Sequence, residues 1–589
     1  MCGIIGYIGK QEAAPLLFNG LKRLEYRGYD SAGIATLDSG LHIKKEVGRI
    51  DDIHSKLNLT DIPGTLGIAH TRWATHGGVT KTNAHPHVDC NGNIAVVHNG
   101  IIENYQELRN SLDSSNHQFK SETDTEIISH LIEDTMKKGY NFEDATISAL
   151  KSLEGSYAVM VMNKDERKLI AARKGSPLVL GVANDGYFGA SDIPAFLEHT
   201  KDVVYMHDFD VAVMSDEGLK ILNILDNKQV DRKIDTIEWD IAQAEKGEFQ
   251  HFMLKEISEQ VDTVQMAVQQ DKKIIDDVVN DIKNAHGIFF IGSGTSYNAC
   301  LAASYIFSKI NKMHINVVLA SEFPNYGHFL TPKTLVIAVS QSGETADVLD
   351  AVKSAKERGC KVISIVNVIG SSLTRTSDSF ISLNAGPEIC VLATKSYTSQ
   401  LALFTLLSYA LTGSYDEGKA KLTYLWNVIY QLTSATMRNK IKELAEKLKG
   451  KNNLFLIGRG LQYTTALEAA LKIKEVSYIH AEAFAGGELK HGTIALIEKG
   501  TPCIVFVSSE NEKQIISNAI EIKSRGGYII GVSPRNNEVF DFWIKAPEAN
   551  SENPIVQIIP IQILAYQLAV LRGLDPDRPR NLAKSVTVN

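Results

Sequence analysis

Short apolar runs and longer amphipathic segments alternate along this chain, and each kind of segment predicts one kind of element. In the first hundred residues, apolar runs at 3–9 (GIIGYIG), 67–72 and 93–98 predict strands. The first run is apolar at most of its positions and contains three glycines, which predicts a buried strand that holds the N-terminus in a core.

Two amphipathic helices are predicted in more detail. The SETDTE segment at 121–126 predicts a helix start, with Ser121 or Thr123 as its N-cap. The second helix spans 345–358, is ended by Gly359, and carries an apolar residue at every third position (Ala346, Leu349, Val352 and Ala355).

The second half of the chain contains an internal repeat. Segment 286–299 resembles segment 452–465, and segment 334–367 resembles segment 501–533, each about 166–168 positions later. In both copies, β-rich apolar runs alternate with amphipathic helices. This alternation predicts parallel βαβ units and two doubly wound αβα sheets.

Composition sets limits on the class of protein. A chain of 589 residues is too long for one core and predicts about three domains or more. A net charge of −8 without a long basic run argues against nucleic acid or an anionic membrane as partner. We expect no transmembrane helix and no export signal. Six scattered cysteines without a C-x-x-C pair predict reduced thiols in a cytoplasm.

The cysteine after the initiator methionine is a candidate nucleophile. If Met1 is removed, Cys2 carries both a thiol and a free α-amine, whose ordinary pKa is about 7.7–8.0. The amine can then accept the thiol proton, so one residue supplies a nucleophile and its base. We therefore expect Met1 to be absent from the mature chain.

Polar residues downstream suit an amino-acid substrate. Arg72 offers a bidentate cation for an α-carboxylate, and Asp124 offers an anion for an α-amine. Asn99 and the N–H of Gly100, where the Val-rich strand is expected to end, offer donors for an oxyanion. Zinc is the alternative for this region, but we expect no metal, because the spacing of its histidines and Cys90 matches no zinc motif (His70, His76, His85, His87 and His98).

Five blocks, MCGIIGYIG, LEYRGYDSAG, HTRWATHG, HNGIIEN and SETDTE, occur in the order typical of class II glutamine amidotransferases, and the region resembles their N-terminal-nucleophile glutaminase domain. The resemblance implies an αββα sandwich in which Cys2 attacks the glutamine amide and releases ammonia. It assigns Arg72 and Asp124 to the glutamine α-groups and Asn99 with Gly100 to the oxyanion hole. Further candidates are glutamine contacts (Trp73, Thr75 and His76) and lid or channel residues (Arg27, Tyr29 and Trp73).

The two repeat copies differ where function is expected. In the first, a strand enters the hydroxyl-rich loop 340–345 (SQSGET) before a helix, an arrangement that suits phosphate. The second has the acidic segment 508–512, so we expect phosphate only in the first copy. GSGTSYNA and SQSGETAD resemble sugar isomerase (SIS) domains, which implies a set of sugar-phosphate ligands (Thr295, Ser296, Ser340, Gln341, Ser342 and Thr345). One departure is Ala393, where the family has serine.

The whole chain resembles the glutamine:fructose-6-phosphate amidotransferase family. The resemblance implies conversion of glutamine and fructose 6-phosphate to glucosamine 6-phosphate in the cytoplasm, by a homodimer without a cofactor. It implies that His491 opens the sugar ring, Lys584 forms a Schiff base, and Glu475 moves a proton with help from Lys472. Glu468 lies on the same helix face as these last two and is assigned to the sugar site.

The resemblance also implies a domain order. We expect a glutaminase domain (1–240), a linker (241–280), two SIS domains (281–430 and 431–570) and a tail that closes the sugar site (571–589). Three alternatives remain at this point: another amidotransferase, a deglycase of sugar-amine phosphates, and a non-catalytic sugar-phosphate sensor.

Overall fold

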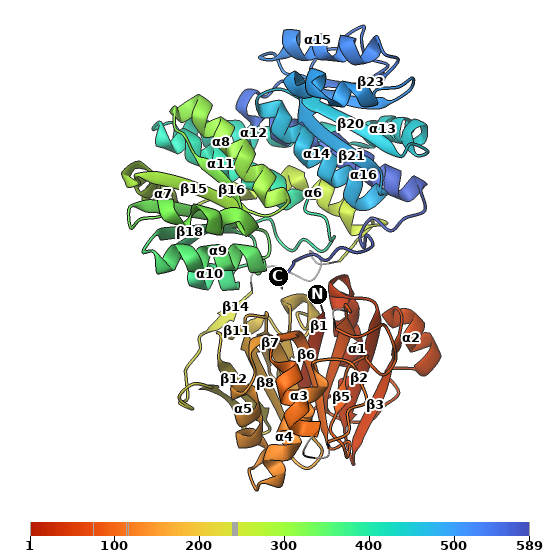
Figure 1. Cartoon of the computed structure of the whole chain (residues 1–589), viewed down its shortest axis with the longest axis vertical. Coiled ribbons are helices and arrows are strands. Elements are labelled where there is room, and N and C mark those ends of the chain that lie inside the picture. The colour runs from red at the N-terminus through yellow and green to blue at the C-terminus, as the bar shows by residue number, and fades with distance from the viewer. Residues whose placement is uncertain (1, 75, 114, 116, 238–244, 588–589) are drawn as a thin grey trace. The chain divides into compact units, whose positions relative to one another are not determined.

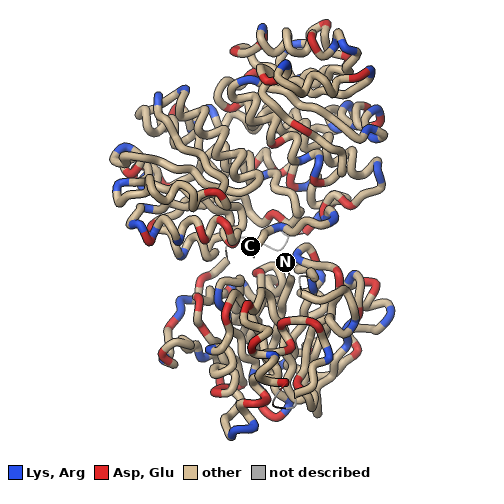
Figure 2. The backbone as a smooth tube through the Cα atoms, viewed as in Figure 1, with Lys and Arg blue, Asp and Glu red and all other residues tan. Residues whose placement is uncertain are grey.

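The computed structural model describes residues 2–74, 76–113, 115, 117–237 and 245–587 (Figure 1). It divides the chain into two compact units, Met1–Ala244 with Ala583–Asn589, and Glu245–Leu582. The predicted domain boundary at residue 240 lies outside the described residues. In both units, lysine and arginine are interspersed with aspartate and glutamate along the backbone (Figure 2).

The first unit contains two antiparallel sheets. The larger has the strand order β14-β11-β9-β10-β1-β4-β2-β3, and the smaller has the order β13-β12-β8-β7-β6-β5. The strands of the larger sheet are β1 (Gly3–Gly9), β2 (Ser31–Leu37), β3 (Leu41–Val47), β4 (Leu66–Arg72), β9 (Val179–Ala183), β10 (Gly186–Ala190), β11 (Asp202–Tyr205) and β14 (Ile234–Thr236). Those of the smaller are β5 (His87–Val88), β6 (Ile94–Ile102), β7 (Gly155–Asn163), β8 (Lys168–Lys174), β12 (Asp210–Ser215) and β13 (Gly218–Asn223).

These sheets form the two inner layers of an αββα sandwich. Strand β1 shows why its sequence is apolar on both faces: Ile4 and Ile8 pack between the sheets, whereas Ile5 and Tyr7 face α1. The helices of this unit are α1 (Ala13–Leu24), α2 (Ile50–Leu57), α3 (Tyr105–Asp113), α4 (Glu126–Lys137) and α5 (Phe142–Lys151). The buried first strand confirms that the N-terminus is held in a core.

Two local predictions in this unit were wrong. Strand β6 does not end at His98–Gly100 but continues to Ile102, because Asn99 and Gly100 remain paired with β7. Helix α4 begins at Glu126 after Thr125, and neither Ser121 nor Thr123 caps it. Instead, the Ser121 hydroxyl and backbone N–H both donate to Glu126 Oε2, at 2.7 and 2.6 Å. The glutamate side chain, rather than a serine cap, fixes this helix start.

The second unit repeats one sheet twice, which confirms the internal repeat. The strand orders are β16-β15-β17-β18-β19 and β21-β20-β22-β23-β24, both entirely parallel. The first copy contains β15 (Gly287–Gly292), β16 (Asn316–Leu319), β17 (Thr334–Ser340), β18 (Lys361–Val366) and β19 (Ser379–Ser382). The second contains β20 (Asn453–Gly458), β21 (His480–Ala485), β22 (Pro502–Phe506), β23 (Tyr528–Ser533) and β24 (Phe542–Lys545).

Helices surround these sheets, and a single core contains apolar residues of both copies. They are α6 (Phe252–Ala267), α7 (Lys272–Asn284), α8 (Thr295–Asn311), α9 (Ala346–Glu357), α10 (Ser372–Thr376), α11 (Lys395–Leu411), α12 (Tyr415–Leu432), α13 (Ala435–Leu448), α14 (Leu461–Ser477), α15 (Glu512–Lys523) and α16 (Asn553–Leu571). In α9 the buried face is not every third residue, as predicted, but has helical spacing (Val348, Ala351, Val352 and Ala355).

Helix α16 is the most apolar helix of this unit. The segment Asn550–Leu571 is long and apolar enough to cross a membrane, with a mean hydropathy of 1.7, but 83% of that window is buried inside the protein. Figure 1 shows it beside α13 and α14 in the second copy. It therefore packs as a core helix.

Candidate active sites

Cys2 lies directly before β1, at the edge of the first unit's sandwich. The backbone N–H of Trp73 points at its sulfur, with an N···S distance of 3.2 Å. Burial raises the pKa of the Cys2 thiol above its ordinary value, while the Trp73 N–H and the Arg72 guanidinium act in the opposite direction. Met1 lies outside the described residues. The N–H of Trp73 and the cation of Arg72 are the groups that would stabilise a thiolate here.

Asn99 and Gly100 lie on β6 near this cysteine. The side-chain amide of Asn99 donates to the carbonyl oxygen of Cys2 at 2.9 Å. Gly100 has a φ of +131°, and a Cβ there would lie 2.0 Å from the carbonyl oxygen of Ser156. A side chain at position 100 is therefore excluded. The structure brings the two predicted oxyanion donors to the strand that passes Cys2.

Arg72 ends β4, and its guanidinium contacts the loop that follows. It donates to the carbonyl oxygens of His76, Gly77 and Gly78, the last two at 3.2 and 3.1 Å. Burial lowers the pKa of Arg72, yet a guanidinium stays protonated in proteins. Its remaining N–H groups are not used in these three bonds, so the cation can hold its own loop and still bind a carboxylate.

The other glutaminase candidates are held by the same loops. Asp124 is buried and accepts from the N–H of Ile102 at 2.9 Å. Trp73 and Tyr29 form an edge-to-face pair with ring centres 5.5 Å apart. Arg27, predicted as a lid residue, is buried and forms an ion pair with Asp192 at 3.2 Å. Thr75 lies outside the described residues.

The histidines of this region serve the interior of the domain. His70 stacks on His85 with ring centres 3.9 Å apart, and its Nε2 is 3.0 Å from the carbonyl oxygen of His98. Burial lowers the pKa of His70 to about 3 and also lowers the pKa values of His85, His87 and His98. These imidazoles are therefore neutral at physiological pH.

In the second unit, the predicted phosphate loop follows β17 and leads into α9. The hydroxyl of Ser340 accepts from the N–H of Gly343 at 3.0 Å and lies 3.3 Å from the hydroxyl of Thr345. Gly343 has a φ of +66°, and a Cβ there would lie 2.0 Å from the Ser371 hydroxyl. The turn therefore requires glycine and places hydroxyl and N–H groups at a helix N-terminus, where anions bind.

A second loop reaches the same sheet edge after β15, the strand adjacent to β17. It carries Thr295 and Ser296 at the start of α8, and Ser296 accepts from the side-chain amide of Gln400 at 3.1 Å. The strand order reverses between β15 and β17, which makes this edge a topological switch point. The two predicted ligand loops therefore meet where ligands bind in open parallel sheets.

A buried network connects this edge to the second copy. Glu468 on α14 accepts from Thr295 at 3.0 Å and from Asn298 at 2.8 Å, while Lys472 donates to Thr295 at 2.9 Å. Lys472 also lies 2.8 Å from Glu475. Burial by itself would lower the pKa of Lys472, but Glu475 and Glu468 hold it above its ordinary value. The lysine is therefore charged.

Asn298 and Gln400 are site residues that sequence reasoning missed. Asn298 lies inside the GSGTSYNA motif, one turn after Thr295, so its position in that motif was an available signal. Gln400 lies on α11, and no motif in the sequence distinguishes it. Its contact with Ser296 depends on how α11 packs against α8.

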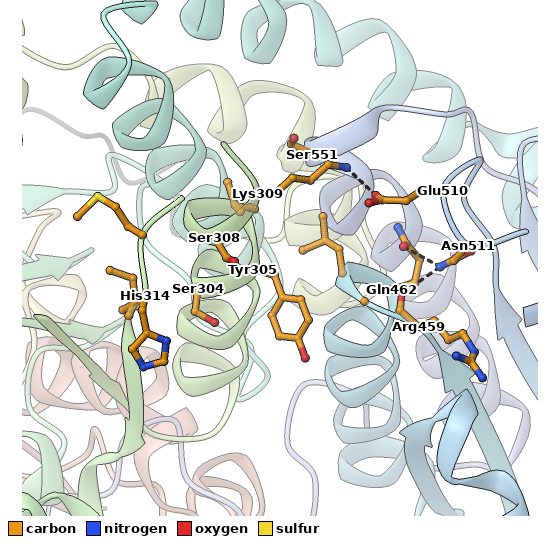
Figure 3. A pocket seen from close by; sticks show the side chains of 15 residues that line it. Ser304, Tyr305, Ser308, Lys309, His314, Arg459, Gln462, Glu510, Asn511 and Ser551 are labelled. Atoms are coloured by element: carbon orange, nitrogen blue, oxygen red, sulfur yellow. Dashed lines mark hydrogen bonds and ion pairs between the residues drawn. The ribbon is translucent and has the colours of Figure 1, made fainter. Parts of the chain in front are cut away.

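The corresponding edge of the second copy has different side chains. Asn511 accepts there from the N–H of Ser508 at 2.9 Å and donates to Gln462 at 2.9 Å. A cavity of about 450 Å³ lies at this edge, lined by both copies. Figure 3 shows Glu510 paired with Lys309 of α8 beside it, at 2.6 Å. A carboxylate here disfavours a phosphate dianion.

Two sugar-site candidates lie apart from the buried network. His491 ends the short helix η5 (Gly486–His491) and is exposed. Lys584 belongs to the segment Ala583–Asn589, which is grouped with the first unit, so its role stays a prediction. The preceding tail packs on the second unit: Asp577 accepts from the N–H groups of Phe252 and Met253 at 2.9 and 2.8 Å.

Comparisons with known proteins agree with these two kinds of site. A glutamine amidotransferase domain model matches residues 70–198, and a SIS domain model matches residues 281–410 and 447–572. The chain is 47% identical to the glutamine–fructose-6-phosphate aminotransferase (isomerizing) of Pyrococcus horikoshii and 43% identical to that of Clostridium acetobutylicum, in both cases over 100% of each chain. The solved C-terminal domain of glucosamine-fructose-6-phosphate aminotransferase from Francisella tularensis matches with a TM-score of 0.52 and 35% identity, over 56% of this chain and 99% of its own.

Proposed function

Because the chain belongs to the glutamine–fructose-6-phosphate aminotransferase (isomerizing) family, we propose that it transfers ammonia from glutamine to fructose 6-phosphate and isomerises the product to glucosamine 6-phosphate. Glutamate is the other product. The reaction is the first step of hexosamine synthesis.

The observation that carries this proposal is the buried network of Thr295, Glu468, Lys472 and Glu475. It places a lysine and two carboxylates of the second copy against a loop of the first copy. A protein that only sensed a sugar phosphate would need the hydroxyl-rich loop but not titratable groups for proton transfer. The network therefore favours catalysis over the sensor alternative.

In the first unit, the Cys2 thiolate attacks the side-chain amide carbon of glutamine. The oxyanion accepts hydrogen bonds from the Asn99 amide and the Gly100 N–H. Collapse of this intermediate releases ammonia and leaves a glutamyl thioester, which water hydrolyses to glutamate. Arg72 binds the substrate α-carboxylate, and Asp124 binds its α-amine.

In the second unit, the phosphate group binds the loop that contains Ser340, Ser342 and Thr345. His491 opens the sugar ring, and the Lys584 amine condenses with the C2 ketone to form a Schiff base, releasing water. Ammonia then displaces the lysine, and Glu475 moves a proton from C1 to C2. Lys472, charged and adjacent to Glu475, keeps that carboxylate ionised between proton transfers.

We also propose a homodimer in which His491 acts on the sugar site of the partner. Its exposed position supports this arrangement. Two inactive variants, His491→Asn and Glu475→Gln, should regain part of the activity when unfolded together and refolded as mixed dimers. No regain of activity, with mixed dimers shown by mass spectrometry, would place His491 in its own chain's site.

Free thiols support a cytoplasmic location for the enzyme. All six cysteines are unpaired with one another, and four of them are buried. An oxidising compartment usually favours disulfides in exported domains, whereas reduced thiols are typical of the cytoplasm.

The direct test is to supply glutamine labelled with ¹⁵N in its amide, together with fructose 6-phosphate, and to identify the product by mass spectrometry. We expect the label in glucosamine 6-phosphate. Cys2→Ala should lower glutamine-dependent synthesis by at least about 10³-fold, because the nucleophile is lost. An unlabelled amino sugar, or no amino sugar from the folded wild-type protein, would reject the proposal.

A further inference from the structure

Four side chains with metal-binding atoms converge in the first unit, outside the glutaminase site. They are Cys90, His117, His130 and Glu133, and one ligand atom from each lies within 4.8 Å of the others. The imidazoles of His117 and His130 and the carboxylate of Glu133 are buried. None of these residues takes part in the proposed reaction.

The distances within this cluster match the edges of a tetrahedron. The Cys90 sulfur is 3.6 Å from His117 Nδ1 and 3.5 Å from His130 Nδ1, and the two Nδ1 atoms are 3.3 Å apart. Glu133 Oε2 is 3.0 Å from His117 Nδ1 and 3.3 Å from His130 Nδ1. Around tetrahedral Zn²⁺, ordinary bond lengths give about 3.5–3.6 Å for S···N edges and about 3.3–3.4 Å for N···N and N···O edges.

Hydrogen bonds alone do not account for this arrangement. The four atoms make five short contacts, yet the thiol and the two Nδ1 atoms supply at most three protons for them. If both Nδ1 atoms are protonated, their hydrogens oppose each other across 3.3 Å. If either is not, contacts between acceptors remain without a proton, which is costly in a buried site. A cation at the centre would satisfy all four atoms together.

The surroundings orient the same four atoms. The far ring nitrogens, Nε2 of His117 and of His130, each lie 3.7 Å from a carboxylate oxygen, of Asp134 and Glu126 respectively. Carboxylates behind ligand histidines are typical of metal sites, where they set the ring orientation and tautomer. The N–H of Gln118 points at the Cys90 sulfur with an N···S distance of 3.5 Å, as expected for a thiolate acceptor.

The remaining carboxylate oxygen of Glu133 is already engaged. Its Oε1 accepts from Lys137 at 2.8 Å and from Asn91 at 3.3 Å. This leaves Oε2 to face the centre of the cluster. A thiolate, a carboxylate and two neutral imidazoles also balance the charge of one divalent cation, which lowers the cost of burying it.

We propose that Cys90, His117, His130 and Glu133 form a structural zinc site in the glutaminase domain. Four protein ligands close the tetrahedron and leave no position for substrate, which distinguishes a structural site from a catalytic one. The donor set of one sulfur, two nitrogens and one oxygen suits a borderline metal such as Zn²⁺ better than Mg²⁺ or Ca²⁺. This inference is independent of the reaction proposed above.

The site connects three segments that are distant in sequence. Cys90 lies in the turn between β5 and β6, His117 in the loop after α3, and His130 with Glu133 on one face of α4. Asp124, the candidate ligand of the glutamine α-amine, directly precedes α4. The metal would therefore hold the segment that carries this aspartate, without contacting substrate.

The experiment measures metal in the full-length protein, purified without a histidine tag or chelator and analysed by elemental mass spectrometry. We expect about one zinc per chain in the wild type. Cys90→Ser and His117→Asn should each reduce the zinc content by at least about tenfold. The matched controls, Cys360→Ser and His42→Asn, change the same residue types outside the cluster and should retain zinc.

A second measurement on the wild type keeps the proposal falsifiable if a variant fails to fold. Zinc is exchanged for Co²⁺, and we expect the visible absorption of tetrahedral cobalt together with a thiolate-to-cobalt charge-transfer band. Zinc chelation should lower the Tm of the wild type by about 5 °C and leave that of Cys90→Ser unchanged. Zinc retained by Cys90→Ser, an octahedral cobalt spectrum, or less than about a tenth of a metal ion per wild-type chain grown with zinc would overturn the proposal.

Discussion

The two SIS copies agree closely in backbone and differ in the side chains at the carboxyl edge of each sheet. Gly294 and Gly460 precede α8 and α14 with φ values of 54° and 55°. The loops that follow β17 and β22 differ: the first has Gly343 and hydroxyl groups, and the second has Glu510 and Asn511. The duplicated fold has therefore kept its turns, while its ligand chemistry has changed in one copy.

The helices that follow those glycines differ in the opposite sense. Helix α14 carries Glu468, Lys472 and Glu475, and the positions about 166 residues earlier on α8 hold Ala302, Ile306 and Lys309. The first copy thus has the phosphate-type loop, and the second has the buried acid–base groups. The bonds of Thr295 with Glu468 and Lys472 join the two halves into one site. The comparison shows how a repeat can divide binding and catalysis between its copies.

The largest expected effect tests the acid–base half of this division. Glu475→Gln should lower glucosamine 6-phosphate synthesis by about 10²–10⁴-fold, because proton transfer from C1 to C2 loses its base. Lys309→Gln changes the equivalent position of α8, where the lysine pairs with Glu510, and should keep near-normal synthesis. Initial rates of product formation, with glutamine hydrolysis measured separately, compare the two. Equal losses would show that α8 and α14 share the catalytic role.

The next effect tests the binding half. Ser342→Glu should raise the KM for fructose 6-phosphate by about 100-fold, since it sets a carboxylate against a phosphate dianion. Ser509→Glu makes the same change in the exposed loop of the second copy and should leave that KM within about twofold. Steady-state kinetics at saturating glutamine give both values. A comparable rise in both variants would mean that each copy binds phosphate.

The smallest effect separates backbone strain from function. Alanine at Gly294 or Gly460 has open space around its Cβ, so only the unfavourable backbone conformation opposes it, at a cost of about 1–3 kcal/mol in each case. Denaturant unfolding should therefore show similar losses. Only Gly294→Ala should also raise the KM for fructose 6-phosphate, because it shifts Thr295. A raised KM in Gly460→Ala alone would reverse the assignment of the copies.

Local pattern was sufficient for much of the fold and failed where tertiary contacts compete with it. The apolar run at 3–9 predicted β1, and the repeated segments predicted two sheets of one strand order, because burial on both faces leaves a direct signal in sequence. The cap of α4 was mispredicted because Ser121 bonds to Glu126 instead of to the helix backbone. The membrane-length α16 is likewise explained by the helices around it, not by its own composition.

The sequence by itself determined the chemistry available at each site: the nucleophile Cys2, the SQSGET loop at 340–345, and the charged face of α14. These are local features, since a motif needs only neighbouring residues. Only the tertiary structure decided which distant residues meet. Glu468 reaches Thr295 across two modules, and Cys90 meets His117, His130 and Glu133 rather than the histidines nearest to it in the chain. Chain folding, not sequence spacing, sets these distances, so the metal-binding geometry had no local signature from which to predict it.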